Sequence, residues 1–290
     1  MFIHSYGSIV CPPVEDIKKY KEEVARHTEL QFRRANRFVL LSLAGAGRCV
    51  HGHAVKKEAA VYLTTENGNL GDTETVLDQI FHHHQFPMPY NFINTMSNTA
   101  SFYIAQSLNL FGRNLTFSSK QLSFERGLEL LRCDLHCGAV EEALIGGVDE
   151  ACASKEQFEA KFQRPCGAFT LVEGSSWLLL KADANNALGE IRTIETLSDI
   201  SKLMDRLKQM APSQRVIRSC GILVDDSDRR AIAAALPASI EFDHFAVLGY
   251  HDSATAAATT AFLERYPSGS WLHINKDVRG QFILLQVEKY

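Results

Sequence analysis

The chain has 290 residues, of which 46% are hydrophobic and 22% charged, with a formal net charge of −4. This is ordinary globular usage, and the slightly acidic balance argues against nucleic acid as a partner, because its binders usually show a basic face. The seven cysteines are an odd number without framework spacing and predict a reducing, cytoplasmic setting. No signal-peptide pattern opens the chain, and the longest apolar stretch, 38–46, is far shorter than the ~20 residues that membrane insertion needs.

Helical and strand patterns alternate along the chain. In the first half, helices are expected at 14–30, 37–50, 72–81, 91–110 and 124–137, and strands at 59–64, 142–145 and 176–181. In the second half, helices are expected at 197–209, 229–236 and 254–266, and strands at 221–224, 244–248, 270–274 and 282–287. This order predicts an α/β protein whose sheet is covered on both faces. Two halves, 1–189 and 190–290, are expected to form one continuous unit, because no low-complexity linker separates them.

Gln121 occupies an unusual position, in a tight turn between a short strand pattern and a long apolar-periodic helix pattern. A side chain at the tip of a strand-to-helix turn lies over a helix N-terminus, where nucleophiles are commonly placed. An amide cannot become a thiolate or an alkoxide, so no acyl-enzyme can form on it. If the chain has an acyl-transfer fold, its nucleophile is missing.

Five blocks in order along the chain carry a family resemblance: 60–70, 89–100, 112–124, 142–150, and Arg164–Pro165 together with 173–180. They resemble the β-ketoacyl synthases, the condensing enzymes of the thiolase fold. In an ungapped match from Gly112, the reactive cysteine of the family falls on Gln121. The resemblance implies a thiolase-like five-layer αβαβα arrangement with a truncated C-terminal half.

The second half lacks the two histidines with which a condensing enzyme stabilises the enolate of its malonyl thioester. The His-Gly-Thr-Gly-Thr motif is absent, and its matching neighbourhood, 222–228, contains no histidine. In the second motif Tyr250 stands at the histidine position, and His251 is one residue away. A small loop shift would be needed to bring His251 into the site. The resemblance therefore implies a catalytically silent protein with no catalytic residue intact.

The first hypothesis is a chain length factor-like subunit that pairs with a complete β-ketoacyl synthase, as a heterodimer or a dimer of heterodimers. The resemblance implies that such a subunit closes the acyl tunnel of its partner, with the growing chain carried on an acyl carrier protein. By this analogy the candidates for lining the tunnel are Thr75, Val76, Gln79 and Ile80. The short second half most resembles the synthase-like proteins of aryl polyene type II polyketide pathways.

Two alternatives stay open. A malonyl-carrier decarboxylase would use the Gln121 amide to hydrogen-bond the thioester oxygen, although this chemistry still needs oxyanion donors that the chain does not clearly supply. A non-catalytic homodimer would bind acyl chains without a synthase partner. The sequence does not separate this homodimer from the first hypothesis.

Other patterns favour plain structural roles. His82, His83 and His84 are consecutive, so they point in different directions and are expected in a solvated loop, not at a metal. Cys133 and Cys137 are one helical turn apart and are expected to pack in the core. Gly45–Gly47 lacks the remainder of a dinucleotide fingerprint. We therefore expect neither a metal nor a cofactor.

Overall fold

The computed structural model describes residues 1–14, 16–30, 32, 35–151, 154–163, 165–167, 169–210 and 216–290. Arg164, which belongs to one of the family-like blocks, lies outside the described residues. Within the described ranges, no helix has both the length and the apolar character that crossing a bilayer requires.

Ten strands in the described residues divide into two sets of five. The first set is β1 (Phe2–Cys11), β2 (Ala60–Thr64), β3 (Asn114–Phe117), β4 (Glu142–Asp149) and β5 (Glu173–Lys181). The second set is β6 (Gly189–Leu197), β7 (Val216–Cys220), β8 (Ile240–Glu241), β9 (Gly269–Lys276) and β10 (Phe282–Lys289). Their order across the sheet is β3-β2-β4-β5-β1-β6-β10-β9-β7-β8. The second set thus repeats the order of the first in reverse.

The pairing directions repeat as well. In each set the second strand runs parallel to the third and fourth, and the fifth runs antiparallel to its two neighbours. The sets meet where β1 and β6 pair over a short antiparallel stretch at Phe2 and Ile3. The boundary expected after residue 189 stays a prediction, because the strands of both halves join in one sheet.

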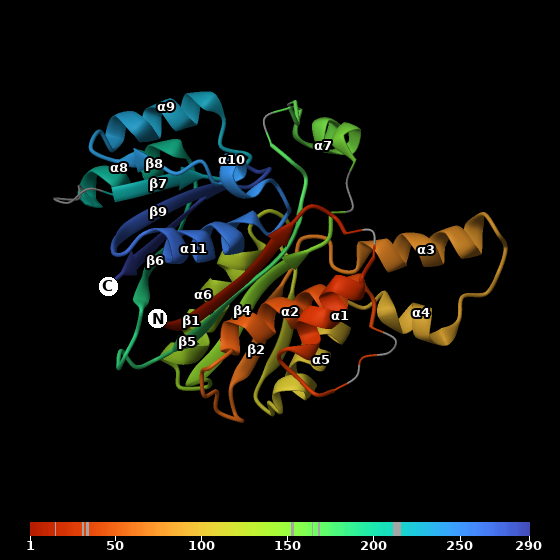
Figure 1. Ribbon diagram of the computed structural model, residues 1–290. Coiled ribbons are helices and arrows are strands. Elements are labelled where there is room, and N and C mark those ends of the chain that lie inside the picture. The colour runs from red at the N-terminus through yellow and green to blue at the C-terminus, as the bar shows by residue number, and fades with distance from the viewer. Residues whose placement is uncertain are drawn as a thin grey trace.

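Helices complete a five-layer arrangement, which Figure 1 shows from one side. One outer layer consists of α1 (Lys18–Ala25), α2 (Arg37–Val50) and α5 (Asn98–Leu108). The central layer, between the two sets of strands, consists of α6 (Ser123–His136) and α11 (Ala254–Arg265). The other outer layer consists of α8 (Ile200–Met210) and α9 (Asp226–Ala235). The expected α/β class and five-layer arrangement are confirmed.

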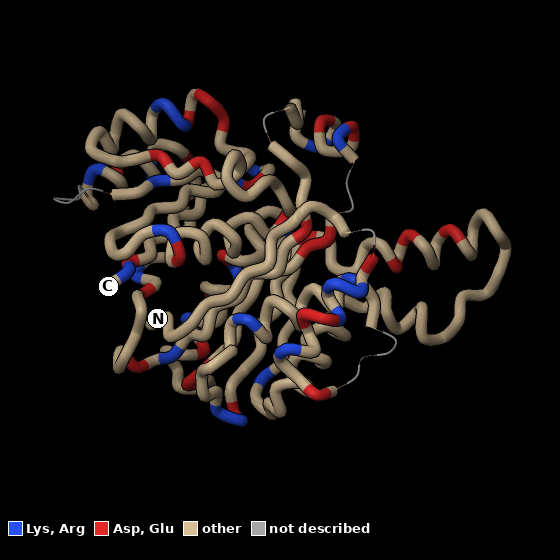
Figure 2. Tube along the Cα trace, in the orientation of Figure 1, with Lys and Arg blue, Asp and Glu red and all other residues tan. Residues whose placement is uncertain are grey.

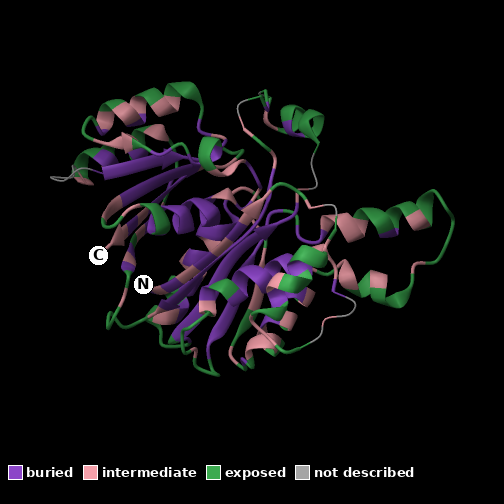
Figure 3. Ribbon diagram, viewed as in Figure 1, coloured by how far each residue is buried: buried purple, intermediate pink, exposed green. Residues whose placement is uncertain are grey.

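The five layers enclose three apolar cores, so the inner strands are buried on both faces, as Figure 3 shows in purple. On β5, Leu178 and Leu180 face the central helices, and Trp177 and Leu179 face α2. This packing is tight enough to demand glycine at contact points. A Cβ at Gly146 would lie 2.1 Å from the Trp177 ring, and one at Gly7 would lie 2.3 Å from the backbone of α2.

Four shorter helices lie outside the layers. Helix α3 (Leu70–Phe81) and helix α4 (Pro89–Asn94) pack on each other and project from the body, as Figure 1 shows. Helix α7 (Lys155–Phe162) and helix α10 (His244–Leu248) lie near the junction of the two halves. The connection from β2 to β3 carries α3, α4 and α5, whereas the equivalent connection from β7 to β8 carries only α9, so the second half is the shorter one.

Several expected elements are corrected by the structure. The strand expected at 244–248 is helix α10, since the Asp243 carboxylate caps it by accepting from the Ala246 N–H at 3.1 Å. The strand expected at 221–224 is a turn that follows β7. The helix expected at 91–110 is two helices, α4 and α5, and the one expected at 14–30 is helical only over α1. Strands β1 and β6 have no counterpart among the expected elements.

Candidate functional site

The turn between β3 and α6 places Gln121 at the junction of the two halves. The Ser123 hydroxyl holds this turn by accepting from the Ser119 N–H at 2.8 Å and donating to the Lys120 carbonyl at 2.7 Å. Lys120 has a φ of 54°, in the left-handed region that residues other than glycine rarely adopt. Backbone strain of this kind is concentrated at functional sites. The turn therefore has the form of a site even though Gln121 cannot act as a nucleophile.

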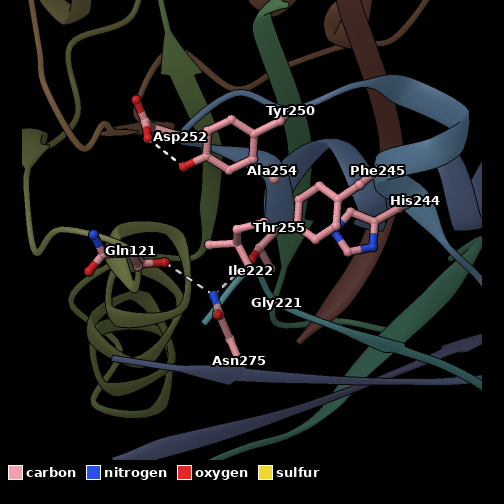
Figure 4. Close-up of a pocket in the computed structure, with 10 residues that line it drawn as sticks. All are labelled: Gln121, Gly221, Ile222, His244, Phe245, Tyr250, Asp252, Ala254, Thr255 and Asn275. Carbon is pink, nitrogen blue, oxygen red and sulfur yellow. Dashed lines mark hydrogen bonds between the residues drawn. The ribbon is translucent and has the colours of Figure 1, made fainter. Parts of the chain in front are cut away.

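The Gln121 side chain is engaged by the protein itself. Its Nε2 donates to Oε1 of Glu66 at 3.0 Å, and its main-chain oxygen accepts from Nδ2 of Asn275 at 3.1 Å. Its Oε1 is buried and has no hydrogen-bond partner among the described residues. Figure 4 shows the main-chain oxygen, not the amide, turned towards Asn275. The amide group is thus directed at an acidic side chain of the same chain.

A small pocket lies beside the turn, in front of α11. Ten residues from both halves line it: Gln121, Gly221, Ile222, His244, Phe245, Tyr250, Asp252, Ala254, Thr255 and Asn275 (Figure 4). The cavity that they leave is about 20 Å³, which is room for roughly one water molecule. None of these ten residues is a cysteine. The pocket therefore offers neither a thiol nor space for an acyl thioester.

Tyr250, at the predicted histidine position, lines this pocket together with Gln121. Its hydroxyl donates to Oδ1 of Asp252 at 2.6 Å. The same Oδ1 lies 3.0 Å from Nζ of Lys161, and that Nζ lies 2.7 Å from Oε1 of Glu66. Glu66 in turn accepts from Gln121, so the two positions that matter in the resemblance are linked through one ion-pair network.

The carboxylates of this network sit in an environment that disfavours their charge. Burial, followed by the charge of Asp252, raises the pKa of Glu66 to about 7, against the opposing effect of Lys161. Burial and then the Asp252 charge also raise the pKa of Asp149 to about 7. Asp149 accepts from the Ser253 hydroxyl and from the main-chain N–H groups of Glu66 and Asn67. These hydrogen bonds fix the loop that carries Glu66.

Two histidines near the pocket are buried and neutral. His244 lines the pocket; burial lowers its pKa to about 3, and its Nε2 has no partner among the described residues. His251 does not line the pocket. A Cβ at Gly174 would lie 2.5 Å from its Nε2, so the ring packs against β5, and burial lowers its pKa to about 4. The histidine one residue after Tyr250 therefore packs against β5 and does not line the pocket that Gln121 lines.

The tunnel candidates lie on α3, away from this pocket. Val76 is buried, Gln79 is half-buried, and Thr75 is exposed and donates its hydroxyl to the Gly71 carbonyl at 3.0 Å. Ile80 is 38% exposed. None of the four lines the pocket beside Gln121, and their role in a tunnel stays a prediction.

Two other sequence patterns resolve plainly. His82 and His83 are exposed and contact Asp78 at 2.7 and 3.1 Å. In the described part of the chain, no group of three or more histidine, cysteine, aspartate or glutamate residues is arranged to hold a metal ion. The expectation of core packing for Cys133 and Cys137 is wrong, since both are exposed. The buried side of α6 carries Phe124, Leu128 and Leu131 instead.

Sequence reasoning missed His244, Glu66, Lys161 and Asp252. His244 falls in a segment with a strand pattern, and the other three come from separate loops or helices that only the fold brings together. Asn275 directly follows the strand expected at 270–274, and Glu66 lies two residues after the end of β2. A polar residue close to the end of a buried strand is the signal that the sequence offered.

No protein-family model matches the chain, and no curated protein matches it in sequence. Solved structures do match. "The ishigamide ketosynthase/chain length factor" superposes with a TM-score of 0.70 at 14% identity, over 99% of this chain and 99% of that one. A type II polyketide synthase ketosynthase structure, "AntDE:AntF (apo)", matches with a TM-score of 0.72 at 11% identity, over 100% of this chain and 99% of that one.

A third match is the "Ketosynthase (ApeO) in Complex with its Chain Length Factor (ApeC) from Xenorhabdus doucetiae", with a TM-score of 0.54 at 12% identity and full coverage of both chains. The chain has the thiolase-like fold of ketosynthases and chain length factors. In this ketosynthase fold, the site at Gln121 holds an amide, an internal ion-pair network and a cavity of about 20 Å³.

Proposed function

We propose that this chain is a non-catalytic, chain length factor-like subunit that pairs with an active ketosynthase in type II polyketide chain elongation. The solved structures that share its fold include a ketosynthase in complex with its chain length factor and a ketosynthase in complex with an acyl carrier protein. Both kinds of partner, the complete ketosynthase and the carrier protein, are part of the proposal. An aryl polyene acyl chain is the product class that we favour.

The observation that carries the proposal is a group of exposed large hydrophobic side chains on α3, α4, α5 and the adjoining loops, of which α5 packs against the edge strand β3. We call it the α3–α5 face, and it is formed by the large hydrophobic side chains that are exposed between residues 77 and 111: Leu77, Ile80, Phe81, Phe86, Met88, Tyr90, Phe92, Ile93, Met96, Phe102 and Phe111. Residues 79–112 contain no Lys, Arg, Asp or Glu. Figure 2 shows the region of α4 and the loop before it in tan, without charged residues.

Depletion of charge with enrichment in aromatic residues and methionine is the composition of a protein–protein interface core. Strand β3 is first in the sheet order, so in the described residues one of its edges has no strand beside it. Unpaired strand edges are templates for pairing with another chain. A partner with the same fold presents a comparable strand and helices, and we therefore assign this face to the ketosynthase subunit.

The pocket argues against the decarboxylase alternative. A Gln121 amide that acts on a thioester oxygen must be directed at the substrate, but its Nε2 donates to Glu66. Tyr250 and Phe245 occupy the space in front of it, and the cavity of about 20 Å³ admits roughly one water molecule and no malonyl group.

Native mass measurement of the chain co-expressed with the complete ketosynthase of its pathway tests the proposal. We expect a stable one-to-one complex, or a pair of such complexes, and condensation only when both chains are present. A homodimer that ignores the ketosynthase would contradict the proposal. Turnover of malonyl-carrier protein by the lone chain would then separate decarboxylation from simple acyl binding.

A further inference from the structure

Helix α7 lies outside the five layers (Figure 1), and two of its phenylalanines pack against Tyr250, which lines the pocket beside Gln121. The Phe158 ring centroid lies 5.0 Å from that of Tyr250, and the Phe162 centroid lies 5.4 Å from it, both edge-on. Phe158 belongs to the same buried cluster as Ile222 and Phe245, which line the pocket. Edge-to-face aromatic contacts of this kind stabilise packing beyond the area that they bury.

Lys161 adds a charged contact between α7 and both halves of the molecule. Its Nζ lies 2.7 Å from Oε1 of Glu66, in the loop after β2, and 3.0 Å from Oδ1 of Asp252, before α11. Each carboxylate also holds a residue of the pocket, since Glu66 accepts from Gln121 at 3.0 Å and Asp252 accepts from Tyr250 at 2.6 Å. One ammonium group thus connects the helix to both of these positions.

We propose that α7 is a clamp that holds Tyr250 and Asp252 in the wall of the pocket beside Gln121, and that Lys161 is the latch that keeps the clamp in place. The proposal does not depend on the ketosynthase partner, because every contact lies within this chain. Lys161 separates two carboxylates that would otherwise repel each other across the junction of the halves. Losing its charge removes the attraction that holds α7 and leaves that repulsion in its place.

The groups that face Lys161 make the latch sensitive to pH. Glu66 and Asp252 contact it directly, and Asp149 on β4 and the Tyr250 hydroxyl face the same two carboxylates. Burial lowers the pKa of Lys161, but the charges of Asp252 and Glu66 outweigh it, so that its pKa is raised and it stays charged. Lys161 lowers the pKa of Glu66, so without that charge the pKa of Glu66 is higher still, and acidification from pH 8 neutralises the repulsion that a charge-free residue 161 would expose.

Hydrogen exchange of α7 in the isolated full-length chain tests the latch. Exchange rates of the α7 amides are first corrected for the intrinsic dependence of exchange on pH. In Lys161→Met the corrected rate is expected to be at least about tenfold above that of the wild type at pH 8 and to fall back towards the wild-type rate at pH 6. Lys155→Met is the matched control, because Lys155 is an exposed lysine of the same helix, and its exchange should equal that of the wild type. A double variant, Lys161→Met with Glu66→Gln, removes one carboxylate and should restore protection at pH 8.

Unchanged exchange in Lys161→Met at both pH values would overturn the proposal. So would an increase that is equal at pH 8 and pH 6, because that result would mean that the lysine acts only through its aliphatic stem. If Lys161→Met loses protection across the whole chain, the double variant decides: failure to regain protection of α7 at pH 8 would contradict the latch.

Discussion

The pocket beside Gln121 and the α3–α5 face differ in the exposure of their side chains. In the pocket, polar groups from both halves bond to one another, and Tyr250 and His244 are almost fully buried. On the face, Phe86 is fully exposed and Phe92 is 60% exposed. The first region is closed by the protein itself, and the second is left open.

This difference indicates where a protein of this kind acts. A soluble monomer rarely exposes a large contiguous apolar patch, because such a surface is unfavourable in water and promotes association. A substrate site, in contrast, needs space, and the pocket beside Gln121 has room for roughly one water molecule. The contribution of the chain is therefore expected from its surface, through the partner that covers it, and not from chemistry at Gln121.

The most direct test of this difference is to place a charge on the α3–α5 face. Phe102 is 59% exposed on α5, which packs beside β3. Phe102→Glu would bury an unpaired carboxylate in the complex, and we expect the affinity for the ketosynthase to fall at least about 30-fold, equivalent to about 2 kcal/mol. Titration calorimetry or native mass spectrometry measures the loss.

Val278→Glu is the matched control for this substitution. Val278 is 75% exposed in the turn between β9 and β10, on the other half of the molecule. It should bind the ketosynthase like the wild type, and both variants should keep the wild-type melting temperature. Equal binding by Phe102→Glu and the wild type would remove the α3–α5 face as the interface.

The burial of His251 near the pocket should make the protein less stable at acidic pH. Burial lowers the pKa of His251 from 6.5 to about 4, so the unfolded chain takes up a proton between these values while the folded chain does not. The contribution of His251 to stability is complete above pH 6.5 and is lost as the pH falls to about 4, on the order of 3 kcal/mol in total. His251→Leu should therefore be less destabilised between pH 6.5 and 4 in urea titrations.

The raised pKa values of Glu66 and Asp149 act in the opposite direction, since their stabilisation is complete below their ordinary values and is lost as the pH rises to about 7. They are common to wild type and variant, so the difference between the two titrations isolates His251. His53→Leu, at an exposed position, is the control. If the free energy of unfolding of His251→Leu fell between pH 6.5 and 4 as steeply as that of the wild type, the His251 ring would be solvated in solution.

Parts of the fold follow directly from the sequence, and others are hidden by close packing. Helix α2 was predictable at both ends because Asn36 caps it and its apolar residues continue to Val50. Strand β1 is hidden because two of its inward positions are Ser5 and Gly7, which the close approach of α2 requires. A strand that buries small or polar residues does not show the apolar alternation that predicts strands.

Some residues of the site could likewise be predicted from the sequence, and others could not. Gln121 is visible in the sequence because its strand, turn and helix are contiguous. The ion-pair network is not, because Glu66, Lys161 and Asp252 are far apart in the chain and meet only where the two halves join. Strand β7 is obscured by Arg218, whose buried guanidinium pairs with Glu241 at 2.9 Å. Polar residues that are paired inside the protein are what sequence patterns fail to place.

Substitutions on α3 sharpen the role of the open region with a smaller effect. Ile80→Trp adds bulk at a partly exposed position, and Ile80→Ala removes it, so neither overpacks the core as a change of the buried Val76 would. If this side of α3 closes the partner's tunnel, Trp should shorten and Ala should lengthen the product of the complex. Mass spectrometry of carrier-bound products measures the shift, and Glu74→Trp, on the other side of the helix, is the control. An unchanged product distribution across the series would rule out the tunnel role.

The smallest expected effect is on chemistry at the turn itself. Gln121→Cys restores a thiol at the nucleophile position, yet we expect no condensing activity from the lone chain. A cysteine there lies beside the buried carboxylate of Glu66, which disfavours a thiolate, and the only histidine that lines the pocket, His244, has a pKa lowered to about 3. The cavity of about 20 Å³ also leaves no room for the acyl and malonyl groups. Carrier-bound product formation is the measurement, with an unchanged melting temperature as the check that the variant is folded. Condensation by this variant without a ketosynthase would show that the closed region can still open to substrate, and the contrast with the α3–α5 face would then fail.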